Sequence, residues 1–193
     1  MPPPYPSAMK PSNSKRRGRV LGVAAAALAW GTVATAQPRE QYLTLRTPQS
    51  AITARITGDS ITSADIQLTR QGQELRGRMF GRVVFLDLEA DEVGGTVGGQ
   101  LTRLHLQEQD GVTQARGNFL GTLMNLSLGP QSLTGSVGRC GYDLKVTPEG
   151  TYQGSRSCGG IPQRPVVLSL PPALTQQGPA MTLTTLAILL GNA

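Results

Sequence analysis

A glycine-punctuated repeat of about twenty residues is the feature that most constrains the fold of this 193-residue chain. When the chain is shifted by forty positions, residues 75–98 (LRGRMFGRVVFLDLEADEVGGTVG) fall on residues 115–138 (ARGNFLGTLMNLSLGPQSLTGSVG). Eight of the 24 aligned positions are identical, including glycines at 77/117, 81/121, 95/135 and 98/138. We therefore interpret the match as a true internal repeat.

A shorter unit lies inside the repeat: an apolar–polar–apolar triplet. Alternation with a period of two predicts a strand with one buried face. The triplets are Leu43-Thr44-Leu45, Ile66-Gln67-Leu68, Leu86-Asp87-Leu88, Leu104-His105-Leu106, Leu126-Ser127-Leu128, Leu144-Lys145-Val146 and Leu168-Ser169-Leu170.

Most triplets are followed by a polar turn and then by a strand that we expect to end in glycine. A second glycine, about four residues later, is expected to make the return turn. The first set is Gly58, Gly77, Gly95, Gly117, Gly135 and Gly154, and the second is Gly81, Gly98, Gly121 and Gly138. Each unit is thus a predicted β-hairpin.

The hairpins predict an all-β fold, an antiparallel meander of about a dozen short strands. Exposed strand edges favour aggregation, so we expect closure into a barrel or a strongly twisted roll. A β-solenoid is the alternative for a twenty-residue period. Turns such as Pro148-Glu149-Gly150 favour hairpins.

The two cysteines, Cys140 and Cys158, are equidistant from this Pro-Glu-Gly turn. In a hairpin centred there they face each other, within range of a disulfide. A redox-active pair or a metal site is the alternative, but the chain has no Cys-x-x-Cys and its single histidine, His105, cannot complete a zinc site. We predict a structural disulfide.

Residues 1–36 have the pattern of a secretory signal peptide, with a basic start, the apolar run Val20–Trp30 and a small-x-small triplet. The general secretory route is favoured over the twin-arginine route, and Met9 is an alternative start. Cleavage is predicted between Ala36 and Gln37; an uncleaved anchor is the alternative. The sequence thus predicts a secreted or periplasmic protein with no transmembrane segment in the mature chain. A β-hairpin repeat domain would span residues 37–170.

Residues 171–193 are expected to form a Pro-rich linker and a short C-terminal helix. Leu183, Leu186, Ala187 and Leu190 fall on one helical face, with Pro179 suited to the first turn and Gly191 to the end. We expect this helix to pack on the sheet or cover its open end. A docking or membrane-surface helix is the alternative.

Charge argues against a nucleic-acid partner. The leader holds 5 of the 18 Lys and Arg residues and no acid, so the mature chain keeps 13 basic and 12 acidic residues. A local anion-binding stripe of Arg76, Arg78 and Arg116 is still a hypothesis, because Arg116 repeats Arg76.

No catalytic residue, metal ligand or cofactor site is predicted. His105 is the polar centre of a triplet and is expected to face solvent, and the acidic cluster Asp87, Glu89, Asp91 and Glu92 has no counterpart forty residues later. We therefore expect an exported, non-catalytic β-repeat protein with a structural or surface-binding role and a partner such as a cell-surface component. A barrel that binds a small apolar ligand and a secreted hydrolase of unrecognised type are the alternatives.

Intact mass spectrometry of protein from separated cell fractions tests the leader and the disulfide together. We expect a species that begins at Gln37 and gains about 2 Da on reduction, because a disulfide lacks two thiol hydrogens. A full-length, reduced, membrane-bound species would instead make residues 20–30 an anchor.

Overall fold

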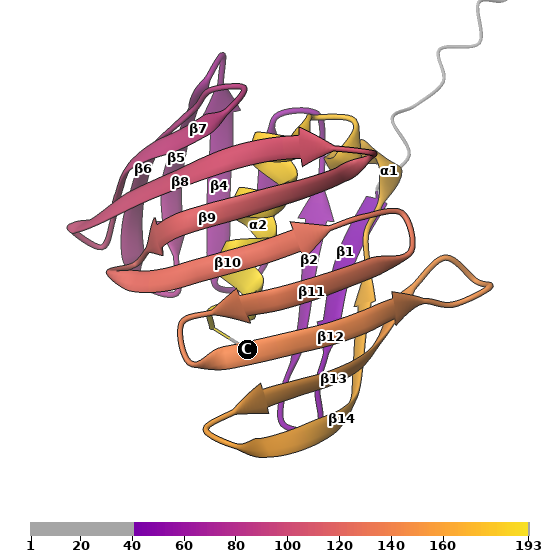
Figure 1. The fold of residues 1–193 in the computed structure, drawn as a ribbon. Coiled ribbons are helices and arrows are strands. Elements are labelled where there is room, and N and C mark those ends of the chain that lie inside the picture. The colour runs from indigo at the N-terminus through magenta and orange to yellow at the C-terminus, as the bar shows by residue number, and fades with distance from the viewer. Residues whose placement is uncertain (1–40, 193) are drawn as a thin grey trace, which may run out of the picture. The chain divides into compact units, whose positions relative to one another are not determined.

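The structure is a computed structural model that describes residues 41–192; the predicted signal peptide, with Ala36 and Gln37, lies outside them. Fourteen antiparallel strands form a meander, and β1 pairs with β14 to close it into a barrel (Figure 1). The predicted meander and its closure are confirmed, and the solenoid alternative is wrong. The strands are β1 (Gln41–Arg46), β2 (Ala51–Ile56), β3 (Ser60–Thr62), β4 (Ile66–Gln71), β5 (Glu74–Met79), β6 (Arg82–Leu88), β7 (Glu92–Val97), β8 (Gln100–Gln109), β9 (Val112–Phe119), β10 (Thr122–Leu128), β11 (Ser132–Val137), β12 (Cys140–Val146), β13 (Tyr152–Cys158) and β14 (Ile161–Ser169).

The return turns contain the glycines that the sequence predicted for them. The return turns are two-residue turns at 80–81, 98–99, 120–121, 138–139 and 159–160. They connect β5 to β6, β7 to β8, β9 to β10, β11 to β12 and β13 to β14. Phe80 and Gly81 have φ of 47° and 76°, and Leu120 and Gly121 have 53° and 72°. Positive φ at both central residues suits the right-handed twist of the flanking strands.

The first set of glycines differs from its prediction, because all but Gly58 lie inside strands. Gly77, Gly95, Gly117, Gly135 and Gly154 occupy inward positions of β5, β7, β9, β11 and β13. A Cβ on Gly135 would lie 2.0 Å from the carbonyl oxygen of Asn125 on β10. The absence of a side chain lets neighbouring backbones approach closely, so these glycines bend the wall rather than end the strands.

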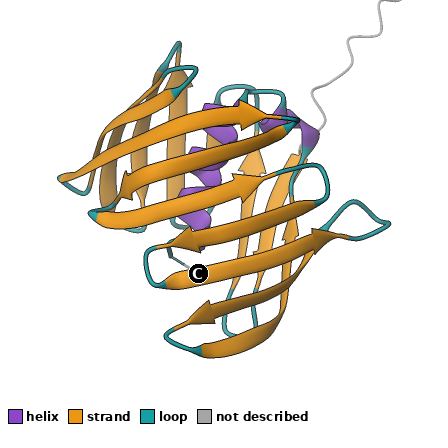
Figure 2. Ribbon diagram, viewed as in Figure 1, coloured by secondary structure: helices purple, strands orange, loops and turns teal. Residues whose placement is uncertain are grey.

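A helix lies inside the barrel. The short helix α1 (Pro172–Thr175) leads into α2 (Pro179–Leu190), which starts and stops where Pro179 and Gly191 predicted. Every residue from Ala180 to Leu190 is buried, and Figure 2 shows α2 between the front and back walls. The expectation that this helix packs on the sheet is confirmed, with the inner face of the wall as its partner, whereas the expected position over the open end is wrong. Because all of these residues are buried, including Thr182, Thr184 and Thr185, the helix has no exposed face for external docking.

The barrel has two rims. We call one the disulfide rim: it carries the five return turns, the end of α2 and the predicted bond between Cys140 and Cys158, which is present with an S–S distance of 2.03 Å. The two cysteines face each other in the register that the hairpin argument predicted, in which Val146 also faces Tyr152. The opposite rim carries the turns at 72–73, 89–91, 110–111, 129–131 and 147–151, with α1 and the start of α2.

Gly135→Ala tests the role of the wall glycines. We expect the free energy of unfolding to fall by about 3 kcal/mol, because the Cβ meets backbone at 2.0 Å and φ is +125°. Gly58→Ala is the matched control, because a Cβ there meets nothing within 4 Å. Equal urea midpoints for the two variants would contradict this interpretation.

Candidate functional site: the mouth at the disulfide rim

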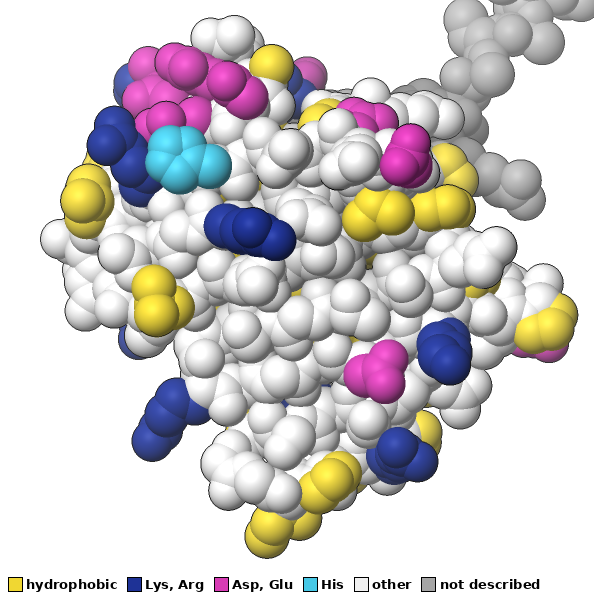
Figure 3. All heavy atoms as spheres, in the orientation of Figure 1, with side chains coloured by type: hydrophobic (Ala, Val, Ile, Leu, Met, Phe, Trp, Pro, Cys, Tyr) yellow, Lys and Arg dark blue, Asp and Glu magenta, His cyan; other side chains and the backbone are white. Residues whose placement is uncertain are grey.

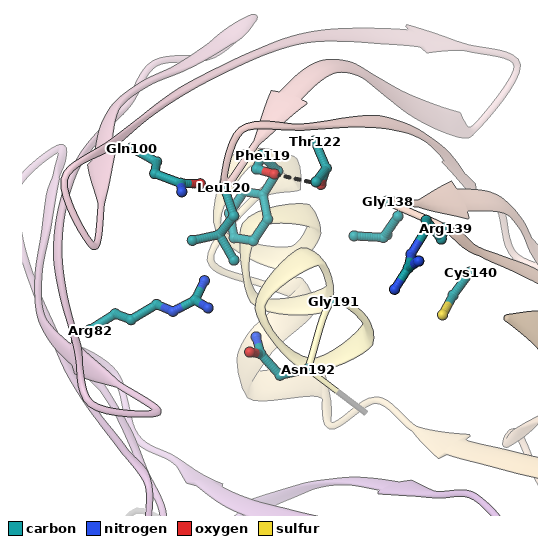
Figure 4. A pocket seen from close by; sticks show the side chains of 11 residues that line it. Arg82, Gln100, Phe119, Leu120, Thr122, Gly138, Arg139, Cys140, Gly191 and Asn192 are labelled. Atoms are coloured by element: carbon teal, nitrogen blue, oxygen red, sulfur yellow. Dashed lines mark hydrogen bonds between the residues drawn. The ribbon is translucent and has the colours of Figure 1, made fainter. Parts of the chain in front are cut away.

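A cavity of about 370 Å³ opens at the disulfide rim, where α2 ends (Figure 4). Figure 4 shows Arg82 and Arg139 on opposite sides of the helix end, with Asn192 between them. Gln100 and Thr122 add polar atoms, while Phe119, Leu120 and Val137 supply apolar wall. The described residues that line this cavity include two guanidinium groups and no carboxylate.

The repeat places the cavity-lining side chains. Arg82, Gln100, Thr122 and Cys140 each occupy the first residue of the strand after a return turn, on β6, β8, β10 and β12. The next inward residues on these strands are Val84, Thr102, Met124 and Tyr142, and all four are buried. Because inward positions alternate along a strand, the first one in each strand lies at the mouth, where solvent and ligand can reach it.

The C-terminal end of α2 stabilises positively charged side chains at this mouth. Helix carbonyls carry partial negative charge at this end, and α2 has no basic residue in its last turn. The wall supplies the missing charge through Arg82, Arg139 and Arg156. Within residues 41–192 neither Arg82 nor Arg139 forms an ion pair with a carboxylate, so both guanidinium groups are available to an anionic ligand.

Arg156 is the buried member of this group. It points inward from β13, is only 5% exposed, and donates from Nε to Gln163 at 2.6 Å and from Nη2 to Gln49 at 3.2 Å. Its strand partner Tyr142 donates its hydroxyl to the carbonyl of Leu190 at 2.6 Å. Arg156 thus places positive charge next to the helix end, and we assign it a structural role.

Acidic and basic side chains are distributed unevenly between the two rims, although residues 37–193 contain nearly equal numbers of them, 13 basic and 12 acidic. Most carboxylates lie in or beside the turns of the opposite rim: Asp59, Glu74, Asp87, Glu89, Asp91, Glu92, Glu108, Asp110 and Glu149. Figure 3 shows one group of them at the top of the visible face. The disulfide rim carries Arg46, Arg78, Arg82, Arg139 and Arg156, with Asp65 as its acidic exception, while Arg55 and Arg70 are basic residues beside turns of the opposite rim. An anion is therefore attracted to one end of the barrel.

The structure does not bring the predicted arginine stripe together. Arg76 and Arg78 lie on β5, and Arg116 lies on β9, with β6, β7 and β8 between them. Arg76 pairs with Glu74 at 2.5 Å and lies 6.0 Å from the ring centre of Phe85. The three arginines share the outer wall but no common cavity, so an anion-binding role for them stays a prediction.

The other candidate side chains also lie on the outer wall. His105 is exposed and lies 3.5 Å from Glu92, which accepts a 2.9 Å hydrogen bond from Arg103. The other members of the acidic cluster, Asp87, Glu89 and Asp91, are exposed. Across residues 41–192, no three His, Cys, Asp or Glu side chains are grouped as metal ligands would be.

Sequence reasoning missed the pairing of Arg82 with Arg139. Arg82 stands out only as one of several arginines near residue 80, and Arg139 lies in a turn more than fifty residues later. A signal was present in the repeat, since both residues adjoin a return-turn glycine. Their convergence depends on α2 ending inside the mouth, which the repeat does not encode.

Comparison with protein-family models, with curated proteins and with solved structures gave no match to this chain. Neither helix in residues 41–192 is long and apolar enough to cross a membrane. The functional argument therefore depends on the geometry of the barrel itself.

Two buried tyrosines predict a loss of stability at alkaline pH. Burial raises the pKa of Tyr142, an effect that nearby Arg156 partly offsets, and burial also raises the pKa of Tyr152, whose hydroxyl donates to Gly129 at 2.9 Å. Above pH about 10 the unfolded chain releases these protons first, so the free energy of unfolding falls as pH rises. Below that pH both states keep the protons and the contribution is constant.

Urea denaturation at several pH values between 8 and 11 measures this effect. The double variant Tyr142→Phe, Tyr152→Phe is expected to lose about 1 kcal/mol per hydrogen bond at pH 8. It should also show a shallower decline above pH 10. Parallel curves for the two proteins would mean that other groups cause the alkaline loss.

Proposed function

We propose that this protein is an exported, non-catalytic β-barrel that binds an anionic partner at the mouth of its disulfide rim. The basic and apolar pattern of residues 1–36 supports export, and the Cys140–Cys158 disulfide fits an oxidising compartment. The partner would be a component of the cell surface or of its surroundings.

One observation carries the choice of ligand class. Arg82 and Arg139 reach the same cavity from β6 and from the β11–β12 turn, and both are exposed. Guanidinium groups bind phosphate and carboxylate oxygens through paired, charge-assisted hydrogen bonds. Gln100, Thr122 and Asn192 add neutral donors around them.

The alternatives have less support. The apolar-ligand hypothesis needs a free lumen, but α2 occupies it with residues that are all buried from Ala180 to Leu190. A hydrolase that uses the single histidine would have to act on the outer wall, where His105 lies with Glu92 as its neighbour. The mouth instead presents hydrogen-bond donors, which suit the binding of an anion.

Titration with inorganic pyrophosphate tests the proposal, using the chain from Gln37 onward because it contains every strand and helix that the structure describes. We expect saturable binding by calorimetry, weakened at least tenfold in Arg82→Gln, Arg139→Gln, since each lost charged hydrogen bond is worth about 1.5–3 kcal/mol. Salt should also weaken binding.

Arg116→Gln is the matched control, because it removes one charge from the outer wall, away from the mouth. Its affinity should stay within about twofold of the parent. Absence of binding, or binding that does not change in the Arg82/Arg139 variant, would overturn the proposal. Loss of binding only in Arg76→Gln, Arg78→Gln, Arg116→Gln would move the site to the predicted stripe.

A further inference from the structure

Exposed aliphatic side chains recur around the disulfide rim. Val83, Leu101, Leu123 and Ile161 are 39%, 68%, 76% and 76% exposed. They lie on β6, β8, β10 and β14, each within two residues of a return turn. We call these four residues the aliphatic arc.

The fold does not require these side chains. Val83, Leu101 and Leu123 point outward, away from the core and α2, and β12 has Gly141 at the equivalent position. Ile161 is instead the first residue of β14, opposite Cys158 at the edge of the rim. Further along β8 and β10 the outward positions are polar, with Arg103, His105, Asn125 and Ser127. On β8 and β10 the exposed apolar side chains are therefore at the rim, which is typical of an interaction surface.

Cations accompany the arc. The segments around the five return turns, 78–83, 96–102, 118–123, 136–141 and 157–164, contain no aspartate or glutamate. They contain Arg78, Arg82, Arg139 and Arg164. Aliphatic side chains with neighbouring cations are what the headgroup region of an anionic bilayer attracts, because each aliphatic enters the acyl boundary while each cation meets a phosphate.

We propose that the disulfide rim docks on an anionic lipid surface, with headgroup phosphates at Arg82 and Arg139 and the aliphatic arc inserted around them. This inference rests on the proposed function, since it identifies the anion as a lipid headgroup. Neighbouring arc residues are two or more strands apart, about 10 Å at the closest. A protein partner would need a continuous patch of about 800 Å², whereas a fluid bilayer accepts separate side chains.

Co-sedimentation with vesicles tests the docking, again with the chain from Gln37 onward. We expect binding to vesicles of phosphatidylcholine mixed with phosphatidylglycerol, weaker binding at high salt, and little binding to phosphatidylcholine alone. Leu101→Ser, Leu123→Ser, Ile161→Ser should lower vesicle affinity by about tenfold for each side chain. The same variant should bind pyrophosphate like the parent.

Phe85→Ser is the matched control, because Phe85 is 53% exposed on the outer wall of β6 but lies further from the rim. It should keep vesicle binding within about twofold, and thermal melting should show that both variants are folded. Pyrophosphate binding without vesicle binding would overturn the docking inference and leave the proposed function standing. Vesicle binding that survives the triple serine variant would overturn insertion of the arc. If the parent protein binds neither pyrophosphate nor anionic vesicles, both proposals are overturned.

Discussion

The filling of the barrel by α2 is the constraint on which the rest of the structure depends. Eight strands enclose a space that side chains alone can fill, whereas fourteen strands enclose a wider one. A helix with its side chains is about 10–12 Å across and fills such a space. Residues Ala180 to Leu190 are buried all round, and inward residues of the wall pack against them. The wall glycines also help to accommodate the helix, because they let alternate strands bend around it without side-chain collisions.

When a helix is enclosed, the partial charges at its ends must be balanced by groups of the surrounding wall. The final carbonyls of α2 lie in the mouth of the disulfide rim, where the helix itself offers no basic side chain. Tyr142 satisfies the carbonyl of Leu190, and the buried Arg156 lies beside it. Arg82 and Arg139 stand further out, in reach of solvent. The cations that complement the helix thus lie at the same rim as the arginines that we propose bind an outside anion.

The uneven distribution of charge between the rims gives the barrel an electrostatic polarity, although its net charge is small. Most carboxylates of the described residues lie at the opposite rim, whereas the disulfide rim carries five arginines and Asp65, so an anionic surface would orient the molecule before contact. The aliphatic arc lies on the same rim as the arginines. Long-range attraction and short-range apolar contact would therefore act on the same face, and the polar outer wall would remain in water.

The sequence by itself determined the hairpin meander, the return turns and the pairing of Cys140 with Cys158, because these follow from local alternation and hairpin symmetry. It predicted closure only as a barrel or a twisted roll, and it did not show that the first glycine of each unit lies inside a strand. It also determined the limits of the C-terminal helix, through Pro179 and Gly191. Only the tertiary structure decided that this helix lies inside the barrel, since a run of apolar residues fits a sheet face or a lumen equally well. The tertiary structure alone also decided which residues line the mouth. Arg82 and Arg139 meet because a closed wall brings distant turns to one rim around the helix end, whereas Arg76 and Arg116, matched in the repeat, are held four strands apart by the regular spacing of that wall.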